Sequence, residues 1–221
     1  MDELVYTLVG EGPTDRRLLA PVDWLFGQLT ERPFRGQWAD NRVLPTAGGG
    51  LAPKLAAALE NFPCDLLLIH RDSDSRDHKP RVCEIDEAAE VVGVERYVRV
   101  IPVQMQEAWF LFDEAAIRSA VGKPSQRNDL NLPAPRNLEA IADPKDRLNQ
   151  ALRDAAALTG RRRKRFSLPH AANLVAERIC DFSPLRGVAS FRRLEKELGH
   201  ALTELERDAS QEMGKGGMKH T

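Results

Sequence analysis

The sequence has few cysteines, no long hydrophobic run and no excess of charge of either sign, and each absence excludes a class of protein. Its three cysteines, Cys64, Cys83 and Cys180, are far apart and form no CxxC pair. They exclude a disulfide framework and a cysteine zinc site, and they favour a reducing, cytoplasmic compartment. The longest apolar runs, such as residues 66–69, are far shorter than the roughly 20 residues that cross a membrane. The acidic start of the chain does not resemble a signal peptide, so we expect a cytoplasmic protein with no membrane partner.

The charge is nearly balanced, with 32 lysines and arginines against 33 aspartates and glutamates and a formal net charge of −1. Because no overall positive field attracts nucleic acid, any such binding must come from a local patch. The best patch is a run of five consecutive cations, and we predict that it binds a polyanion; an exposed linker between helices is the alternative interpretation. The run consists of Arg161, Arg162, Arg163, Lys164 and Arg165.

Short apolar runs alternate with helical patterns in the first half of the chain, which has 42% hydrophobic residues overall. Runs over residues 4–9, 42–45, 65–70 and 97–103 predict four strands, and the segments between them predict crossover helices. The runs are continuous rather than alternating, as in strands that are buried on both faces of a parallel sheet. We therefore predict an α/β, Rossmann-like fold with a central parallel sheet of about four strands flanked by helices.

After residue 103 the pattern becomes helical, with candidate helices over residues 106–117, 144–158, 170–180 and 184–207. We predict an α/β core over residues 1–121, a helical C-terminal extension packed on it over residues 122–210, and a flexible tail over residues 211–221. Trp109 is followed by Phe110 and Phe112, at helical spacing. We interpret Trp109 as a core residue rather than a base-stacking surface.

Carboxylates follow three of the four predicted strands. In open parallel sheets the ligand site lies beyond the carboxyl ends of the strands, so these side chains are the best candidates for chemistry. Several carboxylates in one crevice repel one another unless a cation neutralises them. The five histidines are scattered without metal-ligand spacing, and oxygen ligands alone favour Mg²⁺, or Mn²⁺, over zinc. We predict one or two ions among Glu11, Asp15, Asp72, Asp74 and Glu107, with Asp77 close by.

The same residues also have an ordinary structural interpretation. Asp72-Ser73-Asp74-Ser75 is a common turn composition, and an aspartate such as Asp15 in the first turn of a helix is stabilised by the helix dipole. Only the joint placement of the carboxylates after the first and third strands favours the metal site over the turn.

Two motifs resemble the Toprim domain, which topoisomerases, DnaG-type primases, small ribonucleases and OLD-family nucleases share. The first, Val-Gly-Glu-Gly-Pro-Thr-Asp at residues 9–15, places a Glu-Gly pair after the first strand; the second, Ile-His-Arg-Asp-Ser-Asp at residues 69–74, places an Asp-x-Asp after the third. Residues 107–113 and 143–145 resemble more narrowly an uncharacterised bacterial Toprim-like family related to the OLD nucleases. The resemblance covers most of residues 3–198.

The resemblance implies a Toprim-like fold in which Glu11 is the general acid or base, or a metal ligand. It also implies that Asp72 and Asp74 bind Mg²⁺, that Asp15 binds a second ion and that Glu107 is an additional ligand. Many Toprim domains have a glycine two residues beyond the second aspartate, whereas this sequence has Arg76 there, so the turn is expected to differ.

Three further cations are candidates for contact with substrate phosphates. Lys145 lies in the first turn of a predicted helix, where a cation opposes the helix dipole by a few tenths of a kcal/mol. It is a catalytic candidate that neutralises a phosphate or a leaving group, and a surface pair with its neighbouring aspartates is the equally favoured alternative. Arg71 and Arg76 lie around the aspartate pair and are candidates for binding nucleic acid.

These features predict a Mg²⁺-dependent nuclease that hydrolyses DNA, with RNA as the other candidate substrate. The OLD resemblance also implies a separate ABC-type ATPase as partner, in phage defence, because this chain has no Walker motif. Only two tyrosines, Tyr6 and Tyr97, are present, both inside predicted strands, which argues against a stand-alone topoisomerase. Two alternatives remain: a non-catalytic interaction subunit with the same fold, and a nucleotide-sugar transferase that binds a Mn²⁺-diphosphate.

Overall fold

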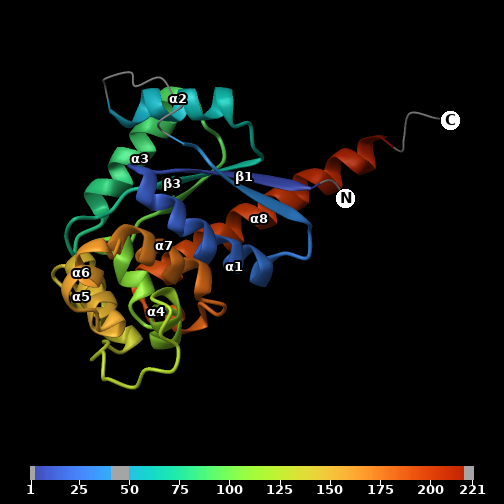
Figure 1. Cartoon of the computed structure of the whole chain (residues 1–221). Coiled ribbons are helices and arrows are strands. Elements are labelled where there is room, and N and C mark those ends of the chain that lie inside the picture. Colours follow the sequence, from blue (N-terminus) through green and yellow to red (C-terminus); the bar gives the residue numbers. More distant parts are fainter. Residues whose placement is uncertain (1–2, 41–49, 217–221) are drawn as a thin grey trace.

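The sheet at the centre of the molecule has four parallel strands. The computed structural model describes residues 3–40 and 50–216. Its strands are β1 (Leu4–Val9), β2 (Phe34–Trp38), β3 (Leu66–His70) and β4 (Tyr97–Val100), in the order β2-β1-β3-β4 (Figure 1). The predicted α/β fold with a four-stranded parallel sheet flanked by helices is therefore confirmed.

Successive side chains of the strands enter two different hydrophobic cores, one on each face of the sheet. In β3, Leu66 and Leu68 belong to the larger core, whereas Leu67 and Ile69 belong to the smaller one. All five residues of β3 are buried. Burial on both faces is the reason that this strand is a continuous apolar run rather than an alternating one.

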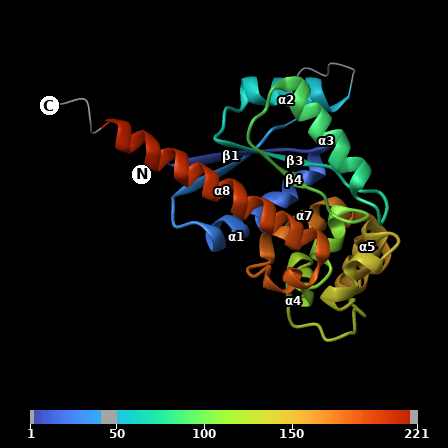
Figure 2. The same cartoon turned by 180° about the vertical axis from the view of Figure 1, so that it is seen from behind.

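Helices cover both faces of the sheet. The helices α2 (Leu51–Asn61) and α3 (Lys79–Val92) pack on one face and enclose the smaller core, while α1 (Leu19–Leu29) and the C-terminal helices cover the other (Figures 1 and 2). A short 3₁₀ helix, η1 (Pro13–Leu18), joins β1 to α1. Helix α3 ends at Gly93, which takes the left-handed conformation (φ 74°) that glycine adopts without strain.

The C-terminal half is helical and shares the larger core with the sheet. Trp109 is fully buried, donates a hydrogen bond from Nε1 to Ser190 Oγ (3.2 Å) and packs edge-on against Phe191. The interpretation of Trp109 as a core residue is therefore confirmed. The elements of this half are η2 (Gln106–Phe110), α4 (Glu114–Ala120), η3 (Pro135–Ala140), α5 (Pro144–Ala156), α6 (Gly160–Arg165), α7 (Leu168–Arg178), η4 (Ser183–Gly187) and α8 (Ala189–Gly216).

The second strand lies elsewhere than the sequence predicted. The predicted strand over residues 42–45 falls outside the described residues, and β2 is formed by Phe34–Trp38. Strand β2 lies at the sheet edge and is only partly buried, so it has no continuous apolar run to reveal it. Gly36 allows it to pair with β1, because a Cβ atom at this position would lie 2.3 Å from the Tyr6 hydroxyl oxygen.

Several helix boundaries also differ from the sequence prediction; the helix predicted over residues 184–207, for example, is divided into η4 and α8. The single helix predicted over residues 106–117 is divided into η2 and α4, because Asp113 caps a new helix by accepting a hydrogen bond from the Ala116 N–H (2.9 Å). Helix α8 continues to Gly216, beyond the predicted start of the tail at residue 211. No helix within residues 3–40 and 50–216 is both long enough and apolar enough to cross a membrane.

Candidate metal centre

The candidate site lies where the connections from two neighbouring strands run in opposite directions. The chain passes from β1 to β2 on one side of the sheet and from β3 to β4 on the other. Strands β1 and β3 are neighbours, with Val9 opposite Ile69 at their carboxyl ends. In open α/β sheets this switch point is where ligands bind, because the diverging loops leave a crevice between them.

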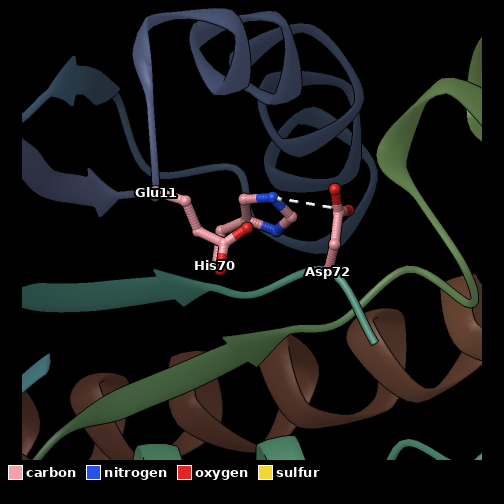
Figure 3. A group of neighbouring side chains, drawn as sticks. All are labelled: Glu11, His70 and Asp72. Atoms are coloured by element: carbon pink, nitrogen blue, oxygen red, sulfur yellow. Dashed lines mark ion pairs between the residues drawn. The ribbon is translucent and has the colours of Figure 1, made fainter. Parts of the chain in front are cut away.

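Three side chains meet at this switch point, which is called the crevice from here on. Glu11 follows β1, His70 is the last residue of β3, and Asp72 comes two residues later (Figure 3). One potential ligand atom from each of them lies within 4.8 Å of the other two, a spacing at which the group could hold a metal ion. His70 is buried, Asp72 is partly buried and Glu11 is exposed at the rim, so the group is anchored in the core and open on one side.

One ring nitrogen of His70 is bound to the backbone of the sheet. Its Nδ1 lies 2.9 Å from the carbonyl oxygen of Val100, and because a carbonyl only accepts, Nδ1 carries the proton. The other nitrogen, Nε2, faces two carboxylates. It is buried and has no hydrogen-bond partner, although it lies 3.6 Å from Asp72 Oδ1 and 3.7 Å from Asp15 Oδ2. Metal-bound histidines characteristically donate their second N–H to a carbonyl in this way.

Asp72 is held in an environment that disfavours its negative charge. Burial is the main cause that raises the pKa of this carboxyl to about 7. The nearby His70 and the hydrogen bond from the Gln106 N–H (2.8 Å) act in the opposite direction, whereas the charges of Glu107 and Asp15 raise the pKa further. A cation in the crevice would compensate this concentration of negative charge.

Asp15 is engaged by the protein itself. Its Oδ2 accepts hydrogen bonds from the backbone N–H groups of Glu11 (2.7 Å) and Gly12 (3.0 Å), and its Oδ1 accepts from Gln106 Nε2 (2.5 Å) and the Thr14 hydroxyl (3.1 Å). These four bonds fix the turn that carries Glu11. The binding of a second ion by Asp15 stays a prediction.

Glu107 is engaged in a buried ion pair. Its Oε1 lies 3.2 Å from Nη1 of Arg17, and both side chains are almost fully buried. Arg17 also donates to the side chain of Asn173 (2.6 Å) and to the carbonyl oxygen of Pro169 (3.4 Å). Burial lowers the pKa of Arg17, and the Glu107 charge opposes that shift. The pair joins η1, η2 and α7 in the wall of the crevice.

Arg71 and Asp74 belong to a chain of ion pairs that begins at the cluster. Nη1 of Arg71 lies 2.5 Å from Glu11 Oε1, and Arg71 also pairs with Glu84. Glu84 pairs with Arg81 (2.7 Å), which in turn pairs with Asp74 (2.6 Å). The structure thus places Asp74 on Arg81, exposed and with positive φ (51°), and outside the group of three potential ligands. Arg71, a nucleic-acid candidate, instead neutralises Glu11.

The remaining candidates make no contact with the cluster. Lys145 is exposed in the first turn of α5, and Arg76 is exposed in the loop after β3. Within the described part of the chain, neither side chain has a hydrogen bond or an ion pair. The five cations of residues 161–165 form most of α6, and all of them are exposed.

Sequence reasoning missed two residues at this site. We expected an oxygen-only ligand set, but His70 contributes a nitrogen to the candidate group; its position at the end of a buried strand, two residues before Asp72, was the available signal. The second is Lys54 of α2, whose Nζ donates to the carbonyl oxygens of Gly10 (3.3 Å) and Glu11 (3.5 Å). Lys54 is 43 residues from Glu11 in the sequence, so no local sequence pattern predicts this contact.

Known proteins offer no guide to what this crevice does. No family model, no curated protein and no solved structure matches the chain. Its function is therefore argued from the geometry of the crevice.

Proposed function

We propose that this protein is a metal-dependent nuclease whose ion is held by Glu11, His70 and Asp72. The observation that carries the proposal is the buried Nε2 of His70, which has no hydrogen-bond partner and lies between carboxylates. Leaving a buried polar atom without a partner costs about 1–3 kcal/mol, and a cation between the three side chains would remove that cost.

We propose a single ion, with Mn²⁺ preferred over Mg²⁺. Asp15 and Glu107 are already engaged by donors of the protein, which leaves three ligands and open positions for water and phosphate oxygens. Carboxylates suit both ions, whereas an imidazole ligand favours a transition metal over Mg²⁺, which prefers oxygen.

Phosphodiester hydrolysis is the reaction that fits these groups and the surrounding cations. A bound divalent ion supplies an activated water and a positive charge for the phosphate oxygens. Glu11 stands at the open rim, with about one third of its side chain exposed, where it can accept a proton from a water molecule. Arg71 pairs with Glu11, and it can pair with a substrate phosphate instead once an ion neutralises that carboxylate.

The proposal also covers the substrate, a partner protein and a biological role. We propose DNA or RNA as the substrate, with the cations of α6 as its backbone contacts. The Toprim resemblance is the sole basis for a separate ABC-type ATPase partner and a role in phage defence. Both are parts of the proposal that a co-purification experiment can test.

The decisive experiment compares Asp72→Asn with Asp77→Asn. Asp77 lies in the same loop but is exposed, and its Oδ1 accepts from the Lys79 N–H, which an asparagine can replace. Labelled DNA and RNA are incubated with each protein in Mn²⁺, Mg²⁺ or chelator. We expect cleavage by the unmodified protein in Mn²⁺, a loss of roughly 100-fold in Asp72→Asn (about 2.7 kcal/mol), and no change in Asp77→Asn.

One observation favours a second candidate, a non-catalytic interaction subunit. Glu11 is already neutralised by Arg71, and Glu107 by Arg17, so part of the acidic crevice is compensated without an ion. That candidate is preferred if Mn²⁺ fails to bind, measured by calorimetry, and if no nucleic acid is cleaved in any of the three conditions.

A further inference from the structure

The cations of α6 form a run of five adjacent side chains without a partner among the described residues. Arg17, Arg71 and Arg99 each pair with a carboxylate, and such pairs recur over the surface. By contrast, within residues 3–40 and 50–216 no side chain of residues 161–165 forms an ion pair or a hydrogen bond. Like charges three or four residues apart on a helix repel, so five adjacent cations destabilise α6 until an anion binds.

A cavity of about 450 Å³ opens between the end of α5 and α6. Arg153 and Arg163 line it together with the carboxylates Asp129 and Asp154. The side chain of Arg153 forms no hydrogen bond or ion pair with any described residue. Phe166, Asn128 and Gln150 also line the cavity, and they supply an aromatic ring and two side-chain amides.

This lining corresponds to the parts of a nucleotide. Guanidinium groups bind phosphate oxygens through paired hydrogen bonds, and an aromatic ring provides a surface on which a base stacks. Gln150 Nε2 is bound to Asp154 Oδ1, which leaves the Gln150 carbonyl oxygen free to accept from a base. A phosphate-only ligand would need the cations but not the ring.

The cavity favours a single strand over a duplex. Bases inside a duplex are stacked on their neighbours, so a ring set in the wall of a cavity cannot reach their faces. The bases of a single strand are free to leave the stack and lie on an aromatic side chain.

The cavity also lies on the correct side of the molecule for the crevice. Helices α5 and α6 are found at the end toward which the carboxyl ends of the strands point (Figures 1 and 2). Pro169, four residues after Arg165, accepts a hydrogen bond from Arg17, which pairs with Glu107 in the crevice wall. A strand bound along α6 is thereby led toward the candidate metal centre.

We infer that the cavity between α5 and α6 holds one nucleotide of a single-stranded nucleic acid, with its phosphates on Arg153 and Arg163 and its base on Phe166. The inference rests on the proposed function, because it names the substrate class of that site. It concerns binding, however, and can be tested without an ion.

The test measures fluorescence anisotropy of labelled oligo(dT), oligo(rU) and a duplex in the presence of chelator. We expect both single strands to bind at least tenfold more tightly than the duplex. The affinities of oligo(dT) and oligo(rU) compare deoxyribose directly with ribose. The double variant R153A/R163A should lose at least tenfold in affinity, and its salt slope should fall by about 1.4, the value for two lost phosphate contacts. The control Arg207→Ala, an exposed cation on α8, should bind within twofold of the unmodified protein.

The variant Phe166→Leu separates base stacking from charge. Leucine keeps the apolar contact of this side chain with the larger core but removes the ring. We expect weaker binding of oligo(dT), by about fivefold or more, and unchanged competition by inorganic polyphosphate, which has no bases. Equal binding of oligo(dT) by Phe166→Leu and the unmodified protein, or tighter binding of the duplex, would overturn the inference. A protein that binds single strands in this way but cleaves none would contradict only the nuclease proposal.

Discussion

His70 donates a hydrogen bond from Nδ1 to the carbonyl oxygen of Val100, its register partner in the neighbouring strand β4, over 2.9 Å. One backbone group of the sheet therefore decides which ring nitrogen faces the crevice. Because the ring is buried and held by this hydrogen bond, it is oriented before any ion arrives, and a preoriented ligand binds with a smaller loss of entropy.

Replacing this imidazole should change which ion the protein prefers. In His70→Asn the nitrogen ligand is lost, so we expect Mn²⁺ affinity to fall by roughly 10- to 100-fold and Mg²⁺ affinity to fall by less. Isothermal titration of both ions measures the change. The control His200→Asn, at an exposed histidine of α8, should leave both affinities unchanged. Unchanged affinities in His70→Asn would show that His70 is not a ligand, and equal losses for the two ions would contradict the predicted preference for Mn²⁺.

The raised pKa of Asp72 predicts a pH dependence of stability. A carboxyl whose pKa is about 7 in the folded protein and 3.8 when exposed binds a proton more tightly in the folded state. Its contribution to the free energy of unfolding is complete below pH 4 and is lost as the pH rises through 7. The difference is of the order of 1 to 4 kcal/mol. Urea unfolding in chelator should therefore show the unmodified protein losing stability relative to Asp72→Asn between pH 5 and pH 8.

Added Mn²⁺ should reverse this trend, since protons compete with the ion for the same carboxylate. We expect the stabilisation by Mn²⁺ to be larger at pH 8 than at pH 5. A stabilisation independent of pH would mean that the ion binds away from Asp72.

The buried pair of Arg17 and Glu107 predicts a non-additive stability effect. Removing one partner, as in Glu107→Gln or Arg17→Met, leaves the other partner's charge buried and unpaired. Each change should therefore lower the free energy of unfolding by about 3–5 kcal/mol. The double variant Arg17→Met/Glu107→Gln removes both charges and should cost less than the sum of the single changes. Urea unfolding of all four proteins completes the cycle; strictly additive costs would show that the pair does not interact.

Two glycines predict opposite outcomes for the same substitution. At Gly36 an added Cβ meets the ring and hydroxyl of Tyr6, whose hydroxyl is held by Asp23, so Gly36→Ala should destabilise by about 1–3 kcal/mol. At Gly199, inside α8, a Cβ has open space, so Gly199→Ala should stabilise by about 0.5–1 kcal/mol. Thermal unfolding distinguishes the two. A neutral Gly36→Ala would mean that Tyr6 moves aside at no cost.

The sequence predicted the features that depend on local pattern. The continuous run in β3 predicted a parallel sheet, and the strand-end rule led to Glu11 and Asp72, two of the three members of the candidate group. Strand β2 was missed because an edge strand needs no continuous apolar run, and its polar residues resemble a loop.

The partners of the carboxylates could not be read from spacing. Asp15 and Glu107 are engaged by groups that tertiary structure brings to them: Gln106 lies 91 positions from Asp15, and Arg17 lies 90 positions from Glu107. Asp74 pairs with Arg81 at the start of the next helix. His70 was overlooked because a lone histidine in a buried strand has no local sign that one of its nitrogens will be left without a partner.

Gln106 connects the two sides of the crevice, since its backbone N–H binds Asp72 while its side chain binds Asp15. It opens the segment that leads into the C-terminal helices, and those helices share their apolar interior with the sheet. A fragment of the first 121 residues should therefore misfold, because the half that contains the sheet has no complete hydrophobic core of its own.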